Sequence, residues 1–450
     1  SRTILSVISL VSYVLTKVAV TVYAGGLVFQ QVFGIKELWG IDFFWIAAIG
    51  LVVLTALYTI FGGMKSVLYT SVLQTPILLL GSLIILVLGF KELGGWDEMM
   101  RVCGAVTVND YGDAMTNLIR SNDDANFPWL GALIGSAIIG FWYWCTDQFI
   151  VQRVLSGKNE KEARRGTIFG AYLKLLPVFL FLIPGMIAFA LHQKYIGAGG
   201  EGFLPMLANG TANADAAFPT LVAKLLPAGV KGLVVCGILA ALMSSLASLF
   251  NSSAMLFTID FYKRFRPETP EKKLVGIGQI ATVVIVILGI LWIPIMRSVG
   301  DVLYTYLQDV QSVLAPGIAA AFLLGICWKR TSAQGGMWGL IAGMVIGLTR
   351  LGAKVYYSNA GEVADSTFKY LFYDMNWLFF CGWMFLFCII VVIVVSLATE
   401  APTAEKIQGL VFGTATKEQK AATRASWDHW DIIHTAIILA ITAAFYWYFW

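Results

Sequence analysis

The stretch "LVVCGILAALMSSLASLFNSSAMLF", residues 233–257, is apolar enough to enter lipid yet carries six polar side chains. A helix needs about 20 residues to cross a hydrocarbon core of roughly 30 Å, and this stretch is long enough. The polar residues are Ser244, Ser245, Ser248, Asn251, Ser252 and Ser253. Polar groups at membrane depth are costly unless they face protein or a water-filled cavity. The stretch therefore predicts a membrane-spanning helix with a functional face.

Similar apolar runs recur along the whole chain. Of its 450 residues, 58% are apolar and only 13% are charged, and the mean hydropathy is +0.77. A soluble domain is about half apolar and about a quarter charged. We expect eleven spans, at 5–33, 42–60, 71–90, 130–150, 167–190, 233–257, 274–295, 303–328, 335–351, 377–397 and 432–450. The predicted fold class is an all-α polytopic membrane protein.

The distribution of charge predicts the orientation in the membrane. The short linkers 152–165 and 260–273 are rich in Lys and Arg, whereas most of the charged residues in the longer linker 91–127 are Asp or Glu. Lys and Arg collect in cytoplasmic loops, which places the two basic linkers inside and 91–127 outside. Alternation then puts Ser1 inside and Trp450 outside. We expect a multi-pass protein of the cell (inner) membrane, in contact with the lipid bilayer.

The hydroxyl cluster of residues 233–257 has two interpretations. Small hydroxyl residues often serve close helix packing in membranes. Alternatively, Ser244 and Ser245, with Ser248 one turn on and the backbone carbonyl of Ala241 one turn before, offer several oxygen ligands in one place. Hard cations take oxygen ligands. Because no carboxylate is present in the cluster, a small monovalent cation such as sodium suits it.

A second unusual stretch, "FWYWCTDQFIVQR" (141–153), closes the apolar run 130–150 with aromatic and hydrogen-bonding side chains. On a continuous helix Tyr143 would pair with Asp147, and Trp144 with Gln148, at i,i+4 spacing. Trp and Tyr also form belts at membrane interfaces, which is the alternative interpretation. Aromatic faces beside uncharged hydrogen-bonding groups suit a sugar, whose CH face and hydroxyls both need partners once desolvated.

Two further spans carry polar residues at depth. Lys174 is the cation in mid-span on the helix of 167–190, where it either extends to the interface or faces a cavity. The span 303–328 begins with several polar residues, Gln308 among them, and we expect its helix to break at Pro316-Gly317.

The residues do not favour an enzyme. A membrane enzyme needs paired carboxylates or a His/Glu metal motif, and His192, His429 and His434 are scattered. Nothing in the composition points to a nucleic-acid partner either. We therefore expect a protein that is not an enzyme.

Several of these stretches together resemble the sodium/glucose cotransporters, the sodium:solute symporter family. The similar segments are "ALYTIFGGMKSVLYT" (56–70), "WYWCTDQFIVQR" (142–153), "YLKLLPVFLFLIPGMI" (172–187), "GLVVCGILAALMSSLASLFNSSAMLFTIDFY" (232–262) and "YLQDVQSVLAPGIAAAFLLGICWKR" (306–330). They occur in family order over nearly the whole chain, which is far more specific than one short motif.

The resemblance implies a leucine-transporter-like fold of two inverted repeats of five helices each. By this resemblance, residues 1–90 supply three helices that complete the first repeat, and 91–127 form an extracellular or periplasmic loop. Residues 128–331 form the second repeat, and 332–450 are peripheral helices. The first helices of the first repeat are expected to be missing from this chain.

The resemblance also implies roles for particular residues. The carbonyl of Ala241 and the side chains of Ser244 and Ser245 match sodium-site positions. Tyr143 matches the aromatic residue that gates the sugar on the cytoplasmic side, with Trp144 beside it. Lys174 and Gln308 match positions that hydrogen-bond the sugar.

Two positions depart from the family pattern. Gly140 stands where relatives often carry Asn or Thr, so a contact to a sugar hydroxyl is lost. Ser71 stands where relatives commonly carry Asp, at a second cation site, and an uncharged Ser there predicts one sodium per sugar.

The resulting hypothesis is symport of sodium and a small neutral sugar of the glucose/galactose type by alternating access. One alternative is the same fold carrying sialate, inositol, proline or pantothenate, since Lys174 could pair with an acidic solute. The other is a sensor that binds sugar without accumulating it.

Overall fold

The computed structural model describes residues 2–207, 210–299, 302–360 and 363–449. Within two of its helices, the side chains of residues 58, 60–71, 73 and 297–299 lie outside this description. Ser1 and Trp450, the predicted inside and outside ends, lie outside the described residues, as does the side chain of Ser71.

The chain folds into two compact units. Unit 1 comprises Ser1–Thr16, Ile119–Phe169 and Ser252–Ile441, and unit 2 comprises Lys17–Leu118, Gly170–Asn251 and Thr442–Trp450. These units interleave along the sequence. The assignment of inverted repeats to 1–90 and 128–331 stays a prediction.

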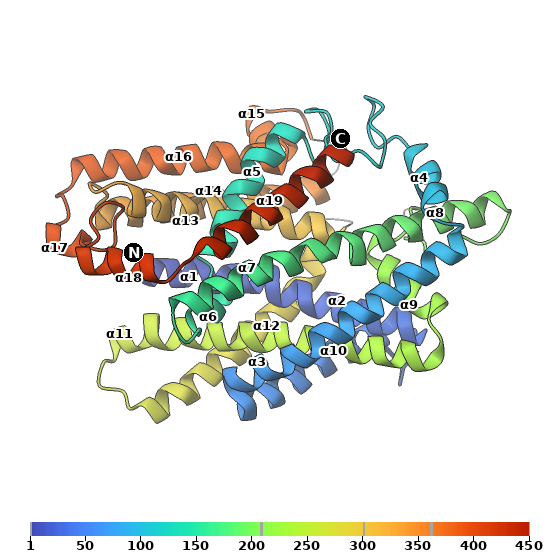
Figure 1. The fold of residues 1–450 in the computed structure, drawn as a ribbon, viewed down its shortest axis with the longest axis horizontal. Coiled ribbons are helices and arrows are strands. Elements are labelled where there is room, and N and C mark those ends of the chain that lie inside the picture. Colours follow the sequence, from blue (N-terminus) through green and yellow to red (C-terminus); the bar gives the residue numbers. More distant parts are fainter. Residues whose placement is uncertain (1, 208–209, 300–301, 361–362, 450) are drawn as a thin grey trace. The chain divides into compact units, whose positions relative to one another are not determined.

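Unit 1 is built from long helices joined by short turns (Figure 1). Its elements are α1 (Arg2–Ser12), the start of the π-helix η1 (Tyr13–Val18), α5 (Trp129–Cys145), α6 (Gln148–Leu155), the start of α7 (Glu160–Pro177), the end of α10 (Ala228–Met255), the π-helix η4 (Leu256–Tyr262), α11 (Lys263–Phe265), α12 (Glu271–Val299), α13 (Leu303–Cys327), α14 (Ala333–Asn359), α15 (Thr367–Lys369), the π-helix η5 (Tyr370–Asp374), α16 (Trp377–Ala398), α17 (Ala404–Ile407), α18 (Lys417–Ala425) and most of α19 (His429–Tyr448).

Unit 2 holds the other helices and a small hairpin. Its elements are the end of η1, α2 (Ala19–Phe33), β1 (Glu37–Leu38), β2 (Ile41–Asp42), α3 (Phe43–Leu93), α4 (Trp96–Gly104), the end of α7, the π-helix η2 (Val178–Leu182), α8 (Ile183–Gly197), the 3₁₀ turn η3 (Ala214–Ala216), α9 (Ala217–Leu225), most of α10 and the end of α19. Strands β1 and β2 pair antiparallel, with Glu37 opposite Asp42. Asp42 then caps α3, because its carboxylate accepts from Phe44 N at 3.0 Å.

The eleven expected spans lie on helices, except that 130–150 crosses the break between α5 and α6. Nine helices of the described residues are long and apolar enough to cross a membrane, and α5 with α6 makes a tenth if this bent pair is one span. The expected span 42–60 corresponds to the shorter apolar helix Phe43–Leu57. It is continuous with the span Gln74–Leu93 in α3, where we expected two separate helices. The chain is a multi-pass helical membrane protein.

Helices α13, α14 and α16 pack against one another along a seam of glycines in unit 1 (Figure 1). Gly335, Gly339, Gly343 and Gly347 recur every fourth residue on one face of α14. A Cβ on Gly343 would lie 2.8 Å from Gly317 Cα, and one on Gly347 would lie 2.2 Å from Val313 O. Small residues at this spacing let helix backbones approach closely in membranes.

The expected break at Pro316-Gly317 is wrong. Helix α13 is continuous from Leu303 to Cys327 with Pro316 inside it. Proline removes one backbone donor from a helix, but neighbouring helices can hold such a helix together in a membrane protein. Here residues 309–320 of α13 are all buried, and Gly317 lies against the backbone of α14.

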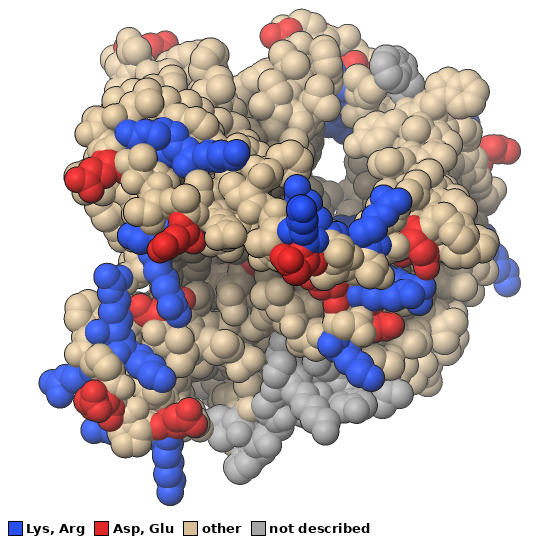
Figure 2. All heavy atoms as spheres, turned by 60° about the vertical axis from the view of Figure 1, so that its left-hand side comes forward, with Lys and Arg blue, Asp and Glu red and all other residues tan. Residues whose placement is uncertain are grey.

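The two basic linkers lie at the same end of unit 1, beside α6, α11 and α18 (Figure 1). Arg165 of the first linker forms an ion pair with Asp428 at 3.2 Å. At the second linker, Asp260 pairs with Arg2, whose Nε donates to it at 2.6 Å. The face shown in Figure 2 carries many Lys and Arg side chains, interspersed with Asp and Glu. The side of the membrane on which these linkers lie stays a prediction.

Candidate functional site

The aromatic stretch 141–153 contains a helix break instead of a continuous helix. Helix α5 ends at Cys145, α6 begins at Gln148, and the two axes differ by 49°. The expected i,i+4 register of Tyr143 with Asp147 and of Trp144 with Gln148 is therefore wrong, because these residues do not belong to one helix. Asp147 instead occupies the N-cap position of α6.

A distant residue holds this break in place. Tyr13 of η1, fully buried, donates its hydroxyl to Asp147 Oδ1 at 2.9 Å. The Phe149 amide donates both to Asp147 Oδ1 at 3.2 Å and to the Tyr13 hydroxyl at 3.1 Å. Asp147 is only 4% exposed, so these donors stabilise its carboxylate in place of water. Sequence analysis missed Tyr13, since nothing in sequence links it to a residue 134 positions away.

Tyr143 and Trp144 lie side by side at the end of α5. Their ring centroids are 5.2 Å apart at 83°, an edge-on arrangement. Trp144 is 51% exposed, whereas Tyr143 is half-buried and packs against the apolar cluster of α5, α13 and α16. The space that a Cβ on Gly140 would enter is open. An accessible ring therefore stands next to a fixed one, which suits a flat apolar ligand face.

Gln308 lies on the first part of α13, in the same unit. It is half-buried, and its Nε2 donates to the Tyr304 hydroxyl at 2.9 Å, one turn away on the same helix. The Gln308 carboxamide is thus oriented by a neighbour on its own helix. Tyr143, Trp144 and Gln308 belong to unit 1.

The other predicted residues belong to unit 2. Lys174 lies on α7 as an exposed residue, one turn before Pro177. There the α-helix gives way to the π-helix η2. Such π-helical turns often occur at functional sites. The exposure of Lys174 is compatible with either interpretation of this residue.

Ala241, Ser244 and Ser245 lie on consecutive turns of α10. Ser248 Oγ donates to the Ser244 carbonyl at 3.0 Å, so this hydroxyl is used within the helix. Ser244 is buried, while Ala241 and Ser245 are partly exposed. Within the described part of the chain, the Ser245 hydroxyl makes no hydrogen bond, so an oxygen ligand remains available there.

Comparison with known proteins identifies the family. The model of the sodium:solute symporter family matches residues 1–343. The chain is 35% identical to a sodium/mannose cotransporter of Bos taurus, over all of this chain and 77% of that protein. It is also 35% identical to sodium/myo-inositol cotransporter 2 of Homo sapiens, over 91% of this chain and 62% of that protein. Sodium/glucose cotransporter 4 of Mus musculus is 35% identical over 91% of this chain, which spans 60% of that protein.

Among solved structures, the chain resembles the substrate-bound outward-open state of a Na⁺-coupled sialic acid symporter. The TM-score is 0.65 with 21% sequence identity, over 89% of this chain and 76% of that chain. The likeness is one of fold and confirms the expected leucine-transporter-like fold class. With the family model matching over three quarters of its length, the chain belongs to the sodium:solute symporter family.

Proposed function

We propose that this chain forms the transport core of a symporter that couples sodium entry to uptake of a small neutral sugar or cyclic polyol by alternating access. Family membership over residues 1–343 is the observation that carries the proposal. Mannose, myo-inositol and glucose, the solutes named for its relatives, are neutral ring polyols. The predicted location is the cell membrane, with the basic linkers 152–165 and 260–273 on the cytoplasmic side.

Sodium is assigned to α10. The Ala241 carbonyl and the hydroxyls of Ser244 and Ser245 are oxygen ligands of the kind a hard monovalent cation takes. The hydroxyl of Ser245, partly exposed and without an intramolecular hydrogen bond in the described chain, supports this role. Ser71, where relatives commonly carry Asp, has no charge, and the proposed stoichiometry is therefore one sodium per sugar.

The solute is assigned to Tyr143, Trp144, Lys174 and Gln308. An aromatic ring covers the apolar CH face of a sugar, while an amide and an ammonium bond its hydroxyls. Tyr143 also acts as the gate, since the neighbouring break between α5 and α6 sets the direction of its helix end. Exposed Lys174 supports an acidic solute such as sialate as the second candidate.

Coupling by one sodium supplies a useful driving force. One charge crossing 100 mV inward contributes about 2.3 kcal/mol, equivalent to about fifty-fold accumulation of the solute. Sodium and solute must each favour the doubly loaded state for this energy to be transferred.

Proteoliposomes containing the full-length protein test the proposal. We expect a sodium gradient to drive uptake of labelled glucose, galactose, mannose or myo-inositol, and unlabelled solute inside to drive counterflow. Competition by sialate, proline or pantothenate but by none of the polyols would reassign the solute. Sugar-dependent currents without counterflow would indicate a sensor and contradict symport.

Variants at single residues test the assignments. Ser245→Ala is expected to raise the half-saturating sodium concentration about tenfold, by loss of one oxygen ligand. Ser248→Ala is the matched control, since its hydroxyl already bonds within α10. Gln308→Ala and Lys174→Ala should each raise the half-saturating solute concentration about tenfold. Unchanged kinetics in both would remove these two residues from the solute site.

A further inference from the structure

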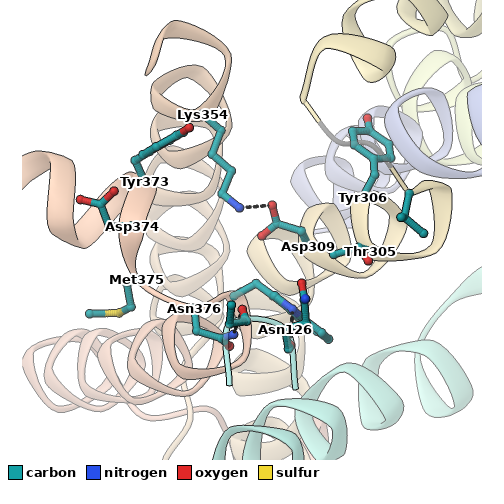
Figure 3. Close-up of a pocket in the computed structure, with 12 residues that line it drawn as sticks. Asn126, Thr305, Tyr306, Asp309, Lys354, Tyr373, Asp374, Met375 and Asn376 are labelled. Atoms are coloured by element: carbon teal, nitrogen blue, oxygen red, sulfur yellow. Dashed lines mark hydrogen bonds and ion pairs between the residues drawn. The ribbon is translucent and has the colours of Figure 1, made fainter. Parts of the chain in front are cut away.

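A cavity of ≈ 360 Å³ lies within unit 1, at the first turns of α13 (Figure 3). Its walls come from α13, the end of α14, the segment 373–377 and the loop residues Ala125 and Asn126. By the predicted topology these parts all lie at the outer side of the membrane. Gln308 is not among the lining residues, so the cavity is distinct from the solute contacts proposed above.

A buried carboxylate contributes to the cavity wall. Asp309 of α13 is 8% exposed and forms an ion pair with Lys354 of α14 through Oδ2, as Figure 3 shows. Its other oxygen, Oδ1, is 3.9 Å from Arg350 Nη2, beyond hydrogen-bond distance. Among the described residues this oxygen has no hydrogen-bond partner. Buried polar atoms are almost always bonded, so Asp309 Oδ1 is an acceptor that calls for a donor.

Arg350 is fixed and does not supply that donor. It is fully buried, and its Nη1 and Nη2 donate to the carbonyls of Leu371 at 3.3 Å and Met375 at 2.6 Å. The guanidinium also lies 4.0 Å from the ring centroid of Phe380. Lys354 is the more accessible cation, since its side chain is 20% exposed.

The polar atoms of two aromatic residues in the cavity walls, Tyr306 and Trp377, are bonded within the framework. The Tyr306 hydroxyl donates to Leu15 O at 3.0 Å and accepts from Trp292 at 2.6 Å. Trp377 Nε1 donates to Asn126 O at 3.0 Å. What these two residues can offer a ligand is therefore their rings, whereas Asp309 Oδ1 has no hydrogen-bond partner among the described residues.

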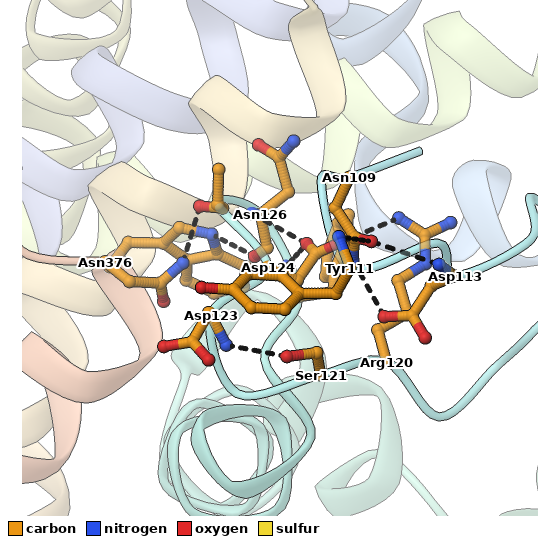
Figure 4. Close-up of polar contacts among 12 residues, drawn as sticks. Asn109, Tyr111, Asp113, Arg120, Ser121, Asp123, Asp124, Asn126 and Asn376 are labelled. Carbon is orange, nitrogen blue, oxygen red and sulfur yellow. Dashed lines mark hydrogen bonds and ion pairs between the residues drawn. The ribbon is translucent and has the colours of Figure 1, made fainter. Parts of the chain in front are cut away.

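The loop that completes the wall is held by its own network (Figure 4). Asp124 is buried and accepts from the amides of Asn126 at 2.9 Å and Phe127 at 2.7 Å. Arg120 lies 3.6 Å from the Asp124 carboxylate. Asn376 Nδ2 donates to Ala125 O at 2.7 Å, tying the loop to the start of α16. The cavity is thus a built structure with a fixed wall.

The charges around the cavity balance. Asp309 lies near Lys354 and Arg350, and Asp374 lies 3.8 Å from Lys369, which also pairs with Asp365 at 2.8 Å. An anion in the cavity would meet the carboxylates of Asp309 and Asp374, and a cation would meet Lys354 and the positive charge of Arg350 behind the wall. A neutral ligand with several hydroxyls meets no net charge and can satisfy both signs.

From this geometry we propose a second ligand site, independent of transport, that binds a neutral polyhydroxy compound such as a ring sugar or cyclic polyol. One hydroxyl donates to the Asp309 carboxylate, an adjacent hydroxyl accepts from Lys354 Nζ, and the apolar ring face lies on Tyr306 or Trp377. The volume corresponds to about a dozen water molecules at ~30 Å³ each, which accommodates a monosaccharide.

Equilibrium binding of labelled glucose, mannose and myo-inositol to the full-length protein in sodium-free buffer tests this site. We expect saturable binding of at least one probe without sodium. Thr305→Trp, which fills the cavity from α13, should weaken it at least about tenfold, as should Lys354→Gln by loss of a charged donor. Lys369→Gln, close by but not lining the cavity, should bind like the unmodified protein and is the matched control.

Other outcomes would overturn the proposal. These are absence of sodium-independent binding for all three probes, binding unaffected in both Thr305→Trp and Lys354→Gln, or an equal loss in Lys369→Gln. If glycine or lactate displaces the labelled probes more strongly than the unlabelled sugars do, the ligand of this site is a zwitterion or an anion and not a neutral compound. If one of the two lining variants fails to fold, as judged by gel filtration, the other decides. Sodium-driven counterflow in the same preparation separately tests the transport function.

Discussion

Two helical segments of unit 1 carry sequence features that affect helices, and they behave in opposite ways. The α5–α6 segment has no proline near its bend, yet its helix ends at Cys145 and restarts at Gln148. Helix α13 contains Pro316 yet runs unbroken. At the first, a carboxylate and a distant hydroxyl satisfy the freed amide of Phe149. At the second, the proline is buried and the adjacent Gly317 lies against the backbone of α14. Tertiary partners, more than local propensity, decide where these helices break.

The largest expected effect comes from disturbing the packing that keeps α13 continuous. Gly343→Val places a Cβ 2.8 Å from Gly317 Cα. Because this contact is too short, the backbone of one of the two helices must move to relieve it. We expect a loss of about 3 kcal/mol in the free energy of unfolding, measured by denaturation in detergent. Gly352→Val is the control, because the space around Gly352 on the same helix is open. Equal losses in both variants would contradict a role for the seam.

The next effect concerns the cap that stabilises the break. Asp147→Ala removes the N-cap of α6 and the acceptor of the Tyr13 hydroxyl. We expect a loss of about 2 kcal/mol, since a buried, charged acceptor is involved. Asp42→Ala, which removes the more exposed N-cap of α3, is the comparison variant. It should lower the free energy of unfolding by less than about 1 kcal/mol, roughly half of the loss expected for Asp147→Ala. A larger loss for Asp42→Ala would show that burial is not the deciding factor.

Tyr13→Phe sharpens the same comparison by removing one oxygen. A double-mutant cycle with Asp147→Ala is expected to give a coupling free energy of about 1 kcal/mol. Additive losses would mean that Tyr13 and Asp147 stabilise the break independently of each other.

The smallest effect is expected at the proline itself. Pro316→Ala returns a backbone N–H to an already helical segment, so the free energy of unfolding should change by less than about 1 kcal/mol. Denaturation in detergent measures this. A loss of several kcal/mol would show that the proline ring fills an essential volume against α14.

These helices also show what the sequence could predict. The apolar runs predicted where the helices lie, because lipid requires long apolar helices whatever their partners. They did not predict that 42–60 and 71–90 belong to one continuous helix, α3. The break at Thr146–Asp147 was not predicted, since it depends on Tyr13. A break was wrongly predicted at Pro316, since the packing of Gly317 against Gly343 of another helix is not visible in the sequence. Family membership was recognised from motifs such as 232–262. The cavity at Asp309 was not predicted, because Lys354 and Arg350 come from another helix. Charged residues are also common near the ends of membrane spans, so these two did not stand out in the sequence.

The glycine seam of α14 has a consequence for movement within unit 1. A slide of α13 along α14 by one residue, about 1.5 Å, would bring larger side chains opposite positions that accept only hydrogen atoms. The backbone contacts of Gly343 with Gly317 and of Gly347 with Val313 therefore hold one alignment. Any displacement of α13 is therefore expected to carry α14 with it, and motion is expected at less tightly packed boundaries.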